Sequence, residues 1–237
     1  MGTEVGHASQ TPVGEHLVLV NPREGYRKWS ASYDDTPNPL LALESRVLAG
    51  ILPPRQGLRI LDAGCGTGRW MERLTADGAA VYGIDFCHEM IEQAARKPRL
   101  RNHCAVADIC ALPIRSCSFD LALCSFTLSY TRSIRNSIAE LARIAGTLVV
   151  SDLHPEAIAR GWRRSFRQNG VTWDIDHLPY TTSVLDVSAR DAALTLTARI
   201  EAGFGEPERE IFRGAGKEST FAAAAACPAI LISKWTR

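Results

Sequence analysis

A glycine-rich loop is the part of this sequence whose residue types and spacing most directly indicate chemistry. Gly64, Gly66 and Gly68 alternate with other residues in the segment 62–68, which follows the short apolar run 58–61. Because glycine has no side chain, such a loop can turn sharply and bring its backbone close to a bound molecule. In an open α/β sheet, ligands bind outside the carboxyl ends of the strands. A loop of this kind directly after a strand therefore predicts a nucleoside site.

The spacing of the glycines separates two classes of cofactor. Dinucleotide-binding loops follow the pattern G-x-G-x-x-G, but Arg69 stands three positions after Gly66, where that pattern needs its third glycine. This disfavours an NAD-dependent oxidoreductase. Asp85 comes about 20 residues after the loop, at the end of the apolar run 80–84, where an acid can accept both hydroxyls of a ribose.

Strands and helices must alternate around the loop to hold these residues in place. Apolar runs predict seven strands, at 58–61, 80–84, 103–107, 119–124, 147–151, 193–200 and 229–235. Helical spacing of apolar residues lies between most of them, and Asn38 followed by Pro39 marks the start of another helix before the loop. We therefore expect an α/β fold with a mostly parallel sheet and helices on both faces.

The loop and its acids resemble the first motifs of the class I S-adenosylmethionine (SAM)-dependent methyltransferases. The resemblance implies a Rossmann-like fold that binds SAM and releases S-adenosylhomocysteine (SAH). It also implies that Asp108, after the third expected strand, receives the adenine amino group while the amide of Ile109 meets the ring. The cofactor-binding residues that it implies are Trp29, Tyr33, Gly64, Cys65, Gly66, Asp85, Phe86, Met90, Asp108, Ile109, Ser125 and Phe126.

The segment 26–34 is similar to the N-terminal segment of the small-molecule branch of that family (methyltransferase type 11), which includes ubiquinone- and biotin-pathway enzymes. In that branch the segment folds over the SAM site, and the resemblance extends over about residues 22–155. Ser125 and Phe126 replace the Asn/Asp-Pro-Pro-aromatic motif of enzymes that methylate amino groups on nucleic acids or glutamine. The resemblance therefore implies a small-molecule acceptor.

We expect one methyltransferase domain over residues 1–237, with an N-terminal helical cap at 1–37 and a substrate lid inserted after the fifth strand at 156–190. Residues 1–20 show no clear period. Aromatic residues alternate with arginines in the lid, which suits a flat or anionic substrate; alternatively, the aromatics anchor the segment to the core. The expected substrate residues are Tyr130, Trp162, Phe166, Trp173 and Tyr180.

Methyl transfer from SAM needs no obligatory catalytic residue, because the sulfonium is already an activated leaving group. The protein has only to hold a nucleophile in line with the methyl carbon, in an SN2 geometry, and to remove a proton where necessary. His154, beyond the end of the fifth strand, is the first candidate base, since imidazole titrates near neutral pH; alternatively it hydrogen-bonds backbone near Pro155. His177 is the second candidate base; alternatively, it lies in a surface loop and takes no part in the reaction.

Composition limits the remaining function classes. The chain has 237 residues, 46% of them hydrophobic and 22% charged, and a net charge of +1. Basic residues are spread out, which disfavours nucleic acid, and there is neither an apolar stretch of 18 residues nor a signal peptide in this sequence. We expect a cytoplasmic monomer or homodimer without a membrane partner. The acceptor, and the choice among O-, N-, C- and S-methylation, stay open.

Seven cysteines without a CxxC pair favour buried free thiols and no metal site. The sharper alternative is a thiol cluster for a metal or arsenic, made of Cys104, Cys110, Cys117 and Cys124. Two alternatives to small-molecule methylation also stand. One is a SAM-binding protein without methyl transfer, as a non-methylating catalyst or an accessory module, and the other is a protein or peptide methyltransferase.

Overall fold

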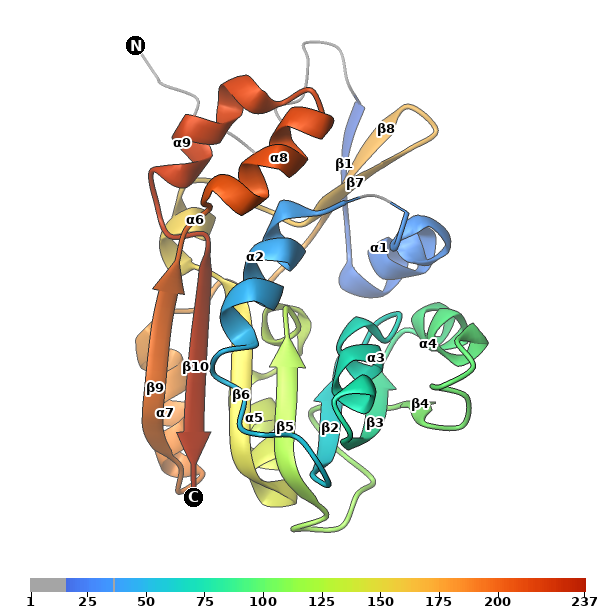
Figure 1. The fold of residues 1–237 in the computed structure, drawn as a ribbon, viewed down its shortest axis with the longest axis vertical. Helices are drawn as coiled ribbons and strands as arrows, with labels where there is room; N and C mark the ends of the chain where they lie inside the picture. The colour runs from blue at the N-terminus through green and yellow to red at the C-terminus, as the bar shows by residue number, and fades with distance from the viewer. Residues whose placement is uncertain (1–15, 36) are drawn as a thin grey trace.

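The structure is a computed structural model that describes residues 16–35 and 37–237. Its centre is a seven-stranded sheet with the strand order β4-β3-β2-β5-β6-β10-β9 (Figure 1). The strands are β2 (Arg59–Ala63), β3 (Ala80–Asp85), β4 (Cys104–Val106), β5 (Phe119–Ser125), β6 (Ala145–Leu153), β9 (Thr195–Ala202) and β10 (Ile230–Thr236). The first five are parallel, whereas β10 runs antiparallel to both β6 and β9. The predicted mostly parallel sheet is confirmed.

Helices cover both faces of this sheet, as predicted, because successive strand residues point to opposite sides. In β2, Ile60 belongs to one buried cluster and Leu61 to the other. On the Ile60 side lie α2 (Pro39–Leu48), α3 (Arg69–Ala76) and α4 (His88–Arg96), and on the Leu61 side lie α5 (Ile134–Ile144) and α7 (Thr182–Asp191). Further helices along the chain are η2 (Leu128–Tyr130), α6 (Pro155–Ala159), α8 (Glu206–Gly214), η3 (Glu218–Thr220) and α9 (Phe221–Ala225).

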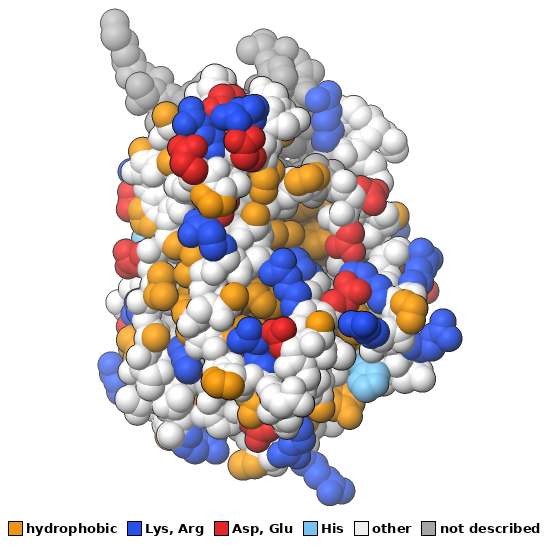
Figure 2. Space-filling view, viewed as in Figure 1, with side chains coloured by type: hydrophobic (Ala, Val, Ile, Leu, Met, Phe, Trp, Pro, Cys, Tyr) orange, Lys and Arg blue, Asp and Glu red, His pale blue; other side chains and the backbone are white. Residues whose placement is uncertain are grey.

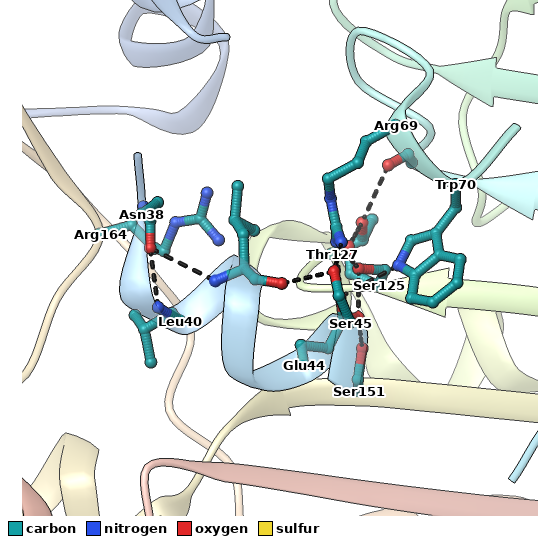
Figure 3. Close-up of polar contacts among 12 residues, drawn as sticks. Asn38, Leu40, Glu44, Ser45, Arg69, Trp70, Ser125, Thr127, Ser151 and Arg164 are labelled. Atoms are coloured by element: carbon teal, nitrogen blue, oxygen red, sulfur yellow. Dashed lines mark hydrogen bonds and ion pairs between the residues drawn. The ribbon is translucent and has the colours of Figure 1, made fainter. Parts of the chain in front are cut away.

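The helix α2 begins where the sequence predicts. The side-chain oxygen of Asn38 accepts from the amides of Leu40, at 2.9 Å, and Leu41, at 3.4 Å, and Pro39 occupies the first helical position (Figure 3). These bonds satisfy amides that have no partner inside the helix. The cap therefore fixes the start of the helix that carries Leu40, Leu41 and Glu44 toward the site.

A second, smaller sheet joins two segments that lie far apart in the sequence. In it β1 (His16–Val20) pairs in parallel with β8 (Val171–Ile175), and β8 pairs antiparallel with β7 (Ser165–Gln168). Between β1 and the main sheet lie α1 (Pro22–Trp29) and η1 (Ser30–Ser32). Figure 1 shows β1, β7, β8 and α1 beyond the carboxyl ends of β2, β3 and β5.

The strand β1 corrects the expected helical cap at 1–37, because residues 16–20 of it form a strand. Residues 17–20 are all apolar, so the sequence shows no alternation of polar and apolar residues, although in the structure Leu17 and Leu19 are exposed and Val20 is buried. The strand exists because β8, about 150 residues later, supplies its hydrogen-bonding partner. The part of the expected cap at residues 1–15 and 36 lies outside the described residues.

The cysteines are free, and Cys65, Cys87, Cys124 and Cys227 are buried, but Cys117 is exposed. Within residues 16–35 and 37–237, no three His, Cys, Asp or Glu side chains are placed to hold a metal ion, which argues against the thiol cluster. None of the helices in the described ranges has both the length and the apolar character of a membrane span.

Candidate functional site

Two adjoining cavities lie at the carboxyl ends of β2, β3 and β5. The first is lined by the glycine loop together with Tyr33, Met90, Ser125 and Phe126. The second has a volume of about 340 Å³ and is lined by Asp108 and its neighbours, while Asp85 and Phe86 line both. Every predicted cofactor residue except Trp29 lines one of these cavities.

All three glycines of the loop have positive φ angles, and Gly64 and Gly66 differ in their surroundings. At Gly64 (φ +77°) a Cβ atom would lie 2.1 Å from Oγ1 of Thr127, so a side chain is excluded by packing. At Gly66 (φ +55°) a Cβ atom would meet nothing within 4 Å, so the missing side chain leaves open space. The amides of Gly64 and Cys65 donate to the carbonyl of Ile84 at 2.7 and 2.9 Å, which ties the loop to β3. A ligand can therefore approach the backbone at Gly66.

The carboxylate of Asp85 is held rigidly between the loop and the helix α4. Its Oδ2 accepts from the amide of Gly66 at 2.9 Å and its Oδ1 from the amide of Cys87 at 2.8 Å. Burial raises the pKa of Asp85 to about 6, against the lowering effect of these amides. Each oxygen retains a further lone pair, so this carboxylate can accept two hydroxyl groups of a ligand that lies across both cavities.

Asp108 lies at the mouth of the second cavity. Its Oδ1 accepts from the amide of Cys110 at 2.8 Å, and its Oδ2 pairs with Arg132, an exposed residue that lines the same cavity. Partial burial acts to raise the pKa of Asp108, but the Cys110 amide and the Arg132 guanidinium outweigh it, and the pKa is lowered. Sequence reasoning placed Asp108 but missed Arg132.

A buried hydrogen-bond network surrounds Glu44 of α2 (Figure 3). Its Oε2 accepts from Nη2 of Arg69 at 2.5 Å and from Nε1 of Trp70 at 3.0 Å. Its Oε1 accepts from the hydroxyls of Ser125, at 2.6 Å, and Ser151. Since Arg69 and Ser125 line the first cavity, this fully buried carboxylate fixes two of its walls.

Sequence reasoning missed Glu44, although a signal was present. Glu44 lies on the same helical stripe as Leu40, Leu43, Val47 and Leu48, and three of these leucines are almost fully buried. A single carboxylate on an otherwise apolar face needs buried partners. That pattern could have indicated a polar site beneath α2, but nothing in the sequence names Arg69 or Ser151 as the partners.

Asp62, which directly precedes the loop, has an unsatisfied oxygen in the first cavity. The residue is 1% exposed, and its Oδ2 has no hydrogen-bond partner among the described residues. Burial raises the pKa of Asp62 to about 7; Arg69 opposes this shift, and Glu44 and Asp85 add to it. A buried carboxylate oxygen beside a cavity fits a ligand that carries a positively charged donor.

The N-terminal segment closes the first cavity with aromatic side chains. Tyr26 and Tyr33 line it, and the ring of Tyr26 meets that of Tyr130 at 5.4 Å in an edge-on contact. The hydroxyl of Thr67 in the loop donates to Oδ1 of Asp34 at 2.8 Å, which links the segment to the loop.

A third cavity, of about 580 Å³, adjoins the first, and Tyr33 and Leu41 line both. It lies between α2, the end of α8 and the insertion after β6. Figure 2 shows this face hollowed between α2 and α1, with hydrophobic side chains in the hollow and charged ones around its rim. The basic residues that line it are Arg163, Arg164, Arg167 and Lys217, and Asp35 is its acidic one.

The predicted substrate residues fall into two groups. Tyr130 lines the first two cavities, and Phe166 lines the third, where it stacks on Trp29 at 4.9 Å. The other three line none of these cavities. Trp162 is buried against Phe204, Tyr180 is buried and donates to Oδ2 of Asp152 at 3.0 Å, and Trp173 lies under Nζ of Lys28 at 4.5 Å. For these three, the contacts favour the anchoring alternative.

Neither candidate base lines any of the three cavities. Nδ1 of His154 accepts from the amide of Glu156 at 3.1 Å and caps α6, and its Nε2 lies 3.7 Å from Glu201. His177 is half-buried in the loop after β8, and burial, together with Arg163, lowers its pKa. These positions favour the structural alternative for His154.

Comparison with known proteins agrees with the geometry. Residues 61–147 match the family model of a methyltransferase domain. A malonyl-[acyl-carrier protein] O-methyltransferase from Enterobacter lignolyticus is 30% identical over 165 residues, which cover 67% of this chain and 61% of that protein. A demethylmenaquinone methyltransferase from Tropheryma whipplei is 29% identical over 175 residues, which cover 70% of this chain and 72% of that protein. This chain thus spans about three fifths of the length of the relative from Enterobacter lignolyticus.

The fold is shared with solved methyltransferase structures. An S-adenosylmethionine dependent methyltransferase from Mesorhizobium loti superposes with a TM-score of 0.66 at 21% identity, over 84% of this chain and 100% of that one. Sheet order, glycine loop and family match agree with the resemblance found in the sequence. Residues 61–147 therefore match the methyltransferase-domain family, and the chain shares its fold with a solved SAM-dependent methyltransferase.

Proposed function

We propose that this chain transfers the methyl group of SAM to a small-molecule acceptor. The observation that carries the proposal is the third cavity, which adjoins the cofactor cavities through Tyr33 and Leu41 and offers room for a second molecule. A protein that only bound SAM would need no such space. When bound, SAM supplies a methyl group on a sulfonium, which is a good leaving group.

The residues around the first two cavities fit SAM by their chemistry. The carboxylate of Asp85, which is fixed by the loop amide, accepts the ribose hydroxyls. The open space at Gly66 lets the ligand lie close to the backbone. The unsatisfied Oδ2 of Asp62 accepts from the ammonium group of the amino-acid end. Asp108 and Ile109 meet the adenine, as the family resemblance implies.

The chain's contribution to the reaction is orientation and exclusion of water. The N-terminal segment covers the first cavity, and Tyr26 and Tyr130 close the wall between the cofactor and solvent. Burial raises the pKa of Tyr26 and of Tyr130, so both phenols stay protonated at neutral pH and donate hydrogen bonds rather than remove protons. Since no histidine of the described residues lines these cavities, an acceptor that is already ionised near neutral pH fits the site best.

The test is SAH formation, followed by mass spectrometry, with a panel of acceptors. The panel contains carboxylic acids, including a malonyl thioester, as well as hydroquinones, phenols, amines and two peptides, and each product is identified by its added methyl group. We expect turnover with a small molecule and its loss in Asp85→Ala. Binding of SAM without turnover on any acceptor would contradict the proposal and support the non-transferring alternative; turnover on peptides alone would support the protein methyltransferase.

A further inference from the structure

We propose that the acceptor carries a carboxylate and that Arg164 binds this carboxylate in the third cavity. This inference rests on the proposed function, because it names the class of acceptor. It starts from a buried cation whose hydrogen-bonding capacity is largely unused.

Arg164 lies immediately before β7, and only 3% of its surface is exposed. Its Nη2 donates to the hydroxyl of Tyr33 at 2.7 Å. Its Nε and Nη1 are buried and have no hydrogen-bond partner among the described residues. A guanidinium has five N–H donors, and burying them unsatisfied is costly. A ligand that accepts from Nε and Nη1 would remove that cost.

Aromatic rings rather than carboxylates surround this guanidinium. Its central carbon lies 5.0 Å from the ring centre of Phe126, 5.7 Å from that of Trp29 and 5.9 Å from that of Tyr33. In the part of the chain that the structure describes, no carboxylate forms an ion pair with Arg164. An arginine presents two N–H groups in a planar fork that matches a carboxylate, so a carboxylate is the ligand that fits the unused donors.

The position of Arg164 places such a carboxylate beside the cofactor. Arg164 lines the third cavity, close to the N-terminal turn of α2, whose Asn38 and Leu40 line it too (Figure 3). Tyr33, to whose hydroxyl Arg164 donates, and Phe126, whose ring lies beside the guanidinium, both line the first cavity. A carboxylate on Nε and Nη1 would therefore lie near the boundary between the two cavities.

The side chains around Arg164 in the third cavity suit the part of the acceptor that lies beyond its carboxylate. Trp29 and Phe166 stack at 4.9 Å with an interplanar angle of 12°, and both line the third cavity. Arg163 adds positive charge to the same cavity. An apolar or aromatic body with one carboxylate fits this combination better than an amine, which the positive charge would repel.

The first experiment measures binding without turnover. The SAH-saturated protein is titrated calorimetrically with two matched pairs, benzoate against benzamide and phenylacetate against phenylacetamide. We expect the acid of at least one pair to bind at least tenfold more tightly than its amide, because hydrogen bonds between a guanidinium and a carboxylate are stronger than those to a neutral amide. Arg164→Met should abolish this difference. Arg160→Met, which removes an arginine paired with Glu156 outside the three cavities, should preserve it.

A thermal melt of the ligand-free protein checks that the variant is folded. Because Arg164→Met replaces a buried, unsatisfied cation by an apolar side chain of similar length, its Tm should equal or exceed that of the wild type. Equal binding of acid and amide in both pairs, or a preference for acids that survives in Arg164→Met, would overturn the inference.

SAM and SAH also carry a carboxylate, so a second experiment tests whether Arg164 binds the carboxylate of the cofactor or that of the acceptor. We expect Arg164→Met to change the Kd of SAH by less than about twofold. A loss of more than tenfold for SAH, but not for its decarboxylated analogue, would assign Arg164 to the cofactor and overturn the inference. Acid binding without SAH formation from SAM would refute the proposed function alone, whereas equal turnover of acids and amides would refute this inference alone.

Discussion

Cofactor binding should depend on pH through Asp62, and the structure sets the size of the effect. The pKa of this carboxyl is raised to about 7 by burial, and its Oδ2 is the unsatisfied oxygen of the first cavity. If the ionised form accepts the ammonium of SAH, about one tenth of the protein is competent at pH 6 and about nine tenths at pH 8. The Kd of SAH should therefore fall about tenfold over this range.

Asp85 adds a smaller contribution of the same sign. Its pKa of about 6 leaves about half of the carboxyl groups ionised at pH 6, so its full ionisation gains about a further factor of two. Calorimetric titrations with SAH from pH 5.5 to 8 measure the combined effect of Asp62 and Asp85 on the Kd. SAH suits this range because its ammonium stays protonated and it carries no reactive sulfonium.

The matched variant is Asp62→Asn, which keeps the shape of the side chain and cannot ionise. It should weaken SAH binding at pH 8 by about tenfold or more, as expected for the loss of a hydrogen bond to a charged group, and reduce the dependence on pH to the twofold effect of Asp85. Equal slopes of log Kd against pH in the wild type and in Asp62→Asn would refute the placement of the ammonium.

The stability of the ligand-free protein provides an independent check of the same pKa. A carboxyl whose folded-state pKa is raised stabilises the fold fully below its unfolded pKa of about 4, and this contribution is lost as the pH rises through about 7. Asp62→Asn should thus match the wild type in Tm near pH 4 and exceed it at pH 8. A variant that melts lower than the wild type at pH 8 would contradict a raised pKa.

Other predictions concern single residues of the site and its frame. Gly64→Ala, whose Cβ would overlap Thr127, should abolish SAH binding and lower Tm by several degrees, measured by calorimetry and thermal melts. Glu44→Gln leaves Arg69 without its buried counter-charge and should cost about 3–5 kcal/mol of unfolding free energy in urea titrations. His154→Ala should leave kcat within about threefold, since the side chain caps α6; a loss of a hundredfold in kcat at unchanged Tm would restore it as the base. Asn38→Ala should lower stability by about 1 kcal/mol through the lost cap of α2.

The main sheet, and the gathering of the expected cofactor residues around two cavities, could be predicted because their signals are local. Each expected strand is a short segment rich in apolar residues, and Asp85 and Asp108 follow two of these segments directly, where parallel topology brings them to one edge of the sheet. The expected strands at 103–107 and 147–151 differ by only a few residues from β4 and β6. The glycine spacing further excluded the dinucleotide pattern without any knowledge of the fold.

The small sheet and the buried networks could not be predicted, because they depend on pairings between distant segments. The strand β1 gains its hydrogen bonds from β8, and Glu44 gains its partners from α3, β5 and β6. A histidine that follows a strand can face a cavity or cap a helix, and the sequence is the same in both cases. The spacing of residues therefore could not show which role His154 has. Likewise, four arginines in the lid segment look alike in sequence, and only packing distinguishes Arg164.

The first cavity contains buried acidic groups and the third cavity a buried cation, and these groups link the stability of the protein to the binding of its ligands. Asp62 and Asp85 are buried carboxyls whose pKa values are raised by burial, and Arg164 is a buried cation with unsatisfied donors. Each arrangement costs stability in the empty protein, since buried charges need partners. A positively charged methyl donor beside the carboxyls and a negatively charged acceptor beside Arg164 would each supply the missing partner. Because the folded state alone offers these partnerships, each ligand should raise Tm by mass action. A joint increase in Tm larger than the sum of the two single increases would show that the opposite charges interact across the boundary at Tyr33, which lines both cavities.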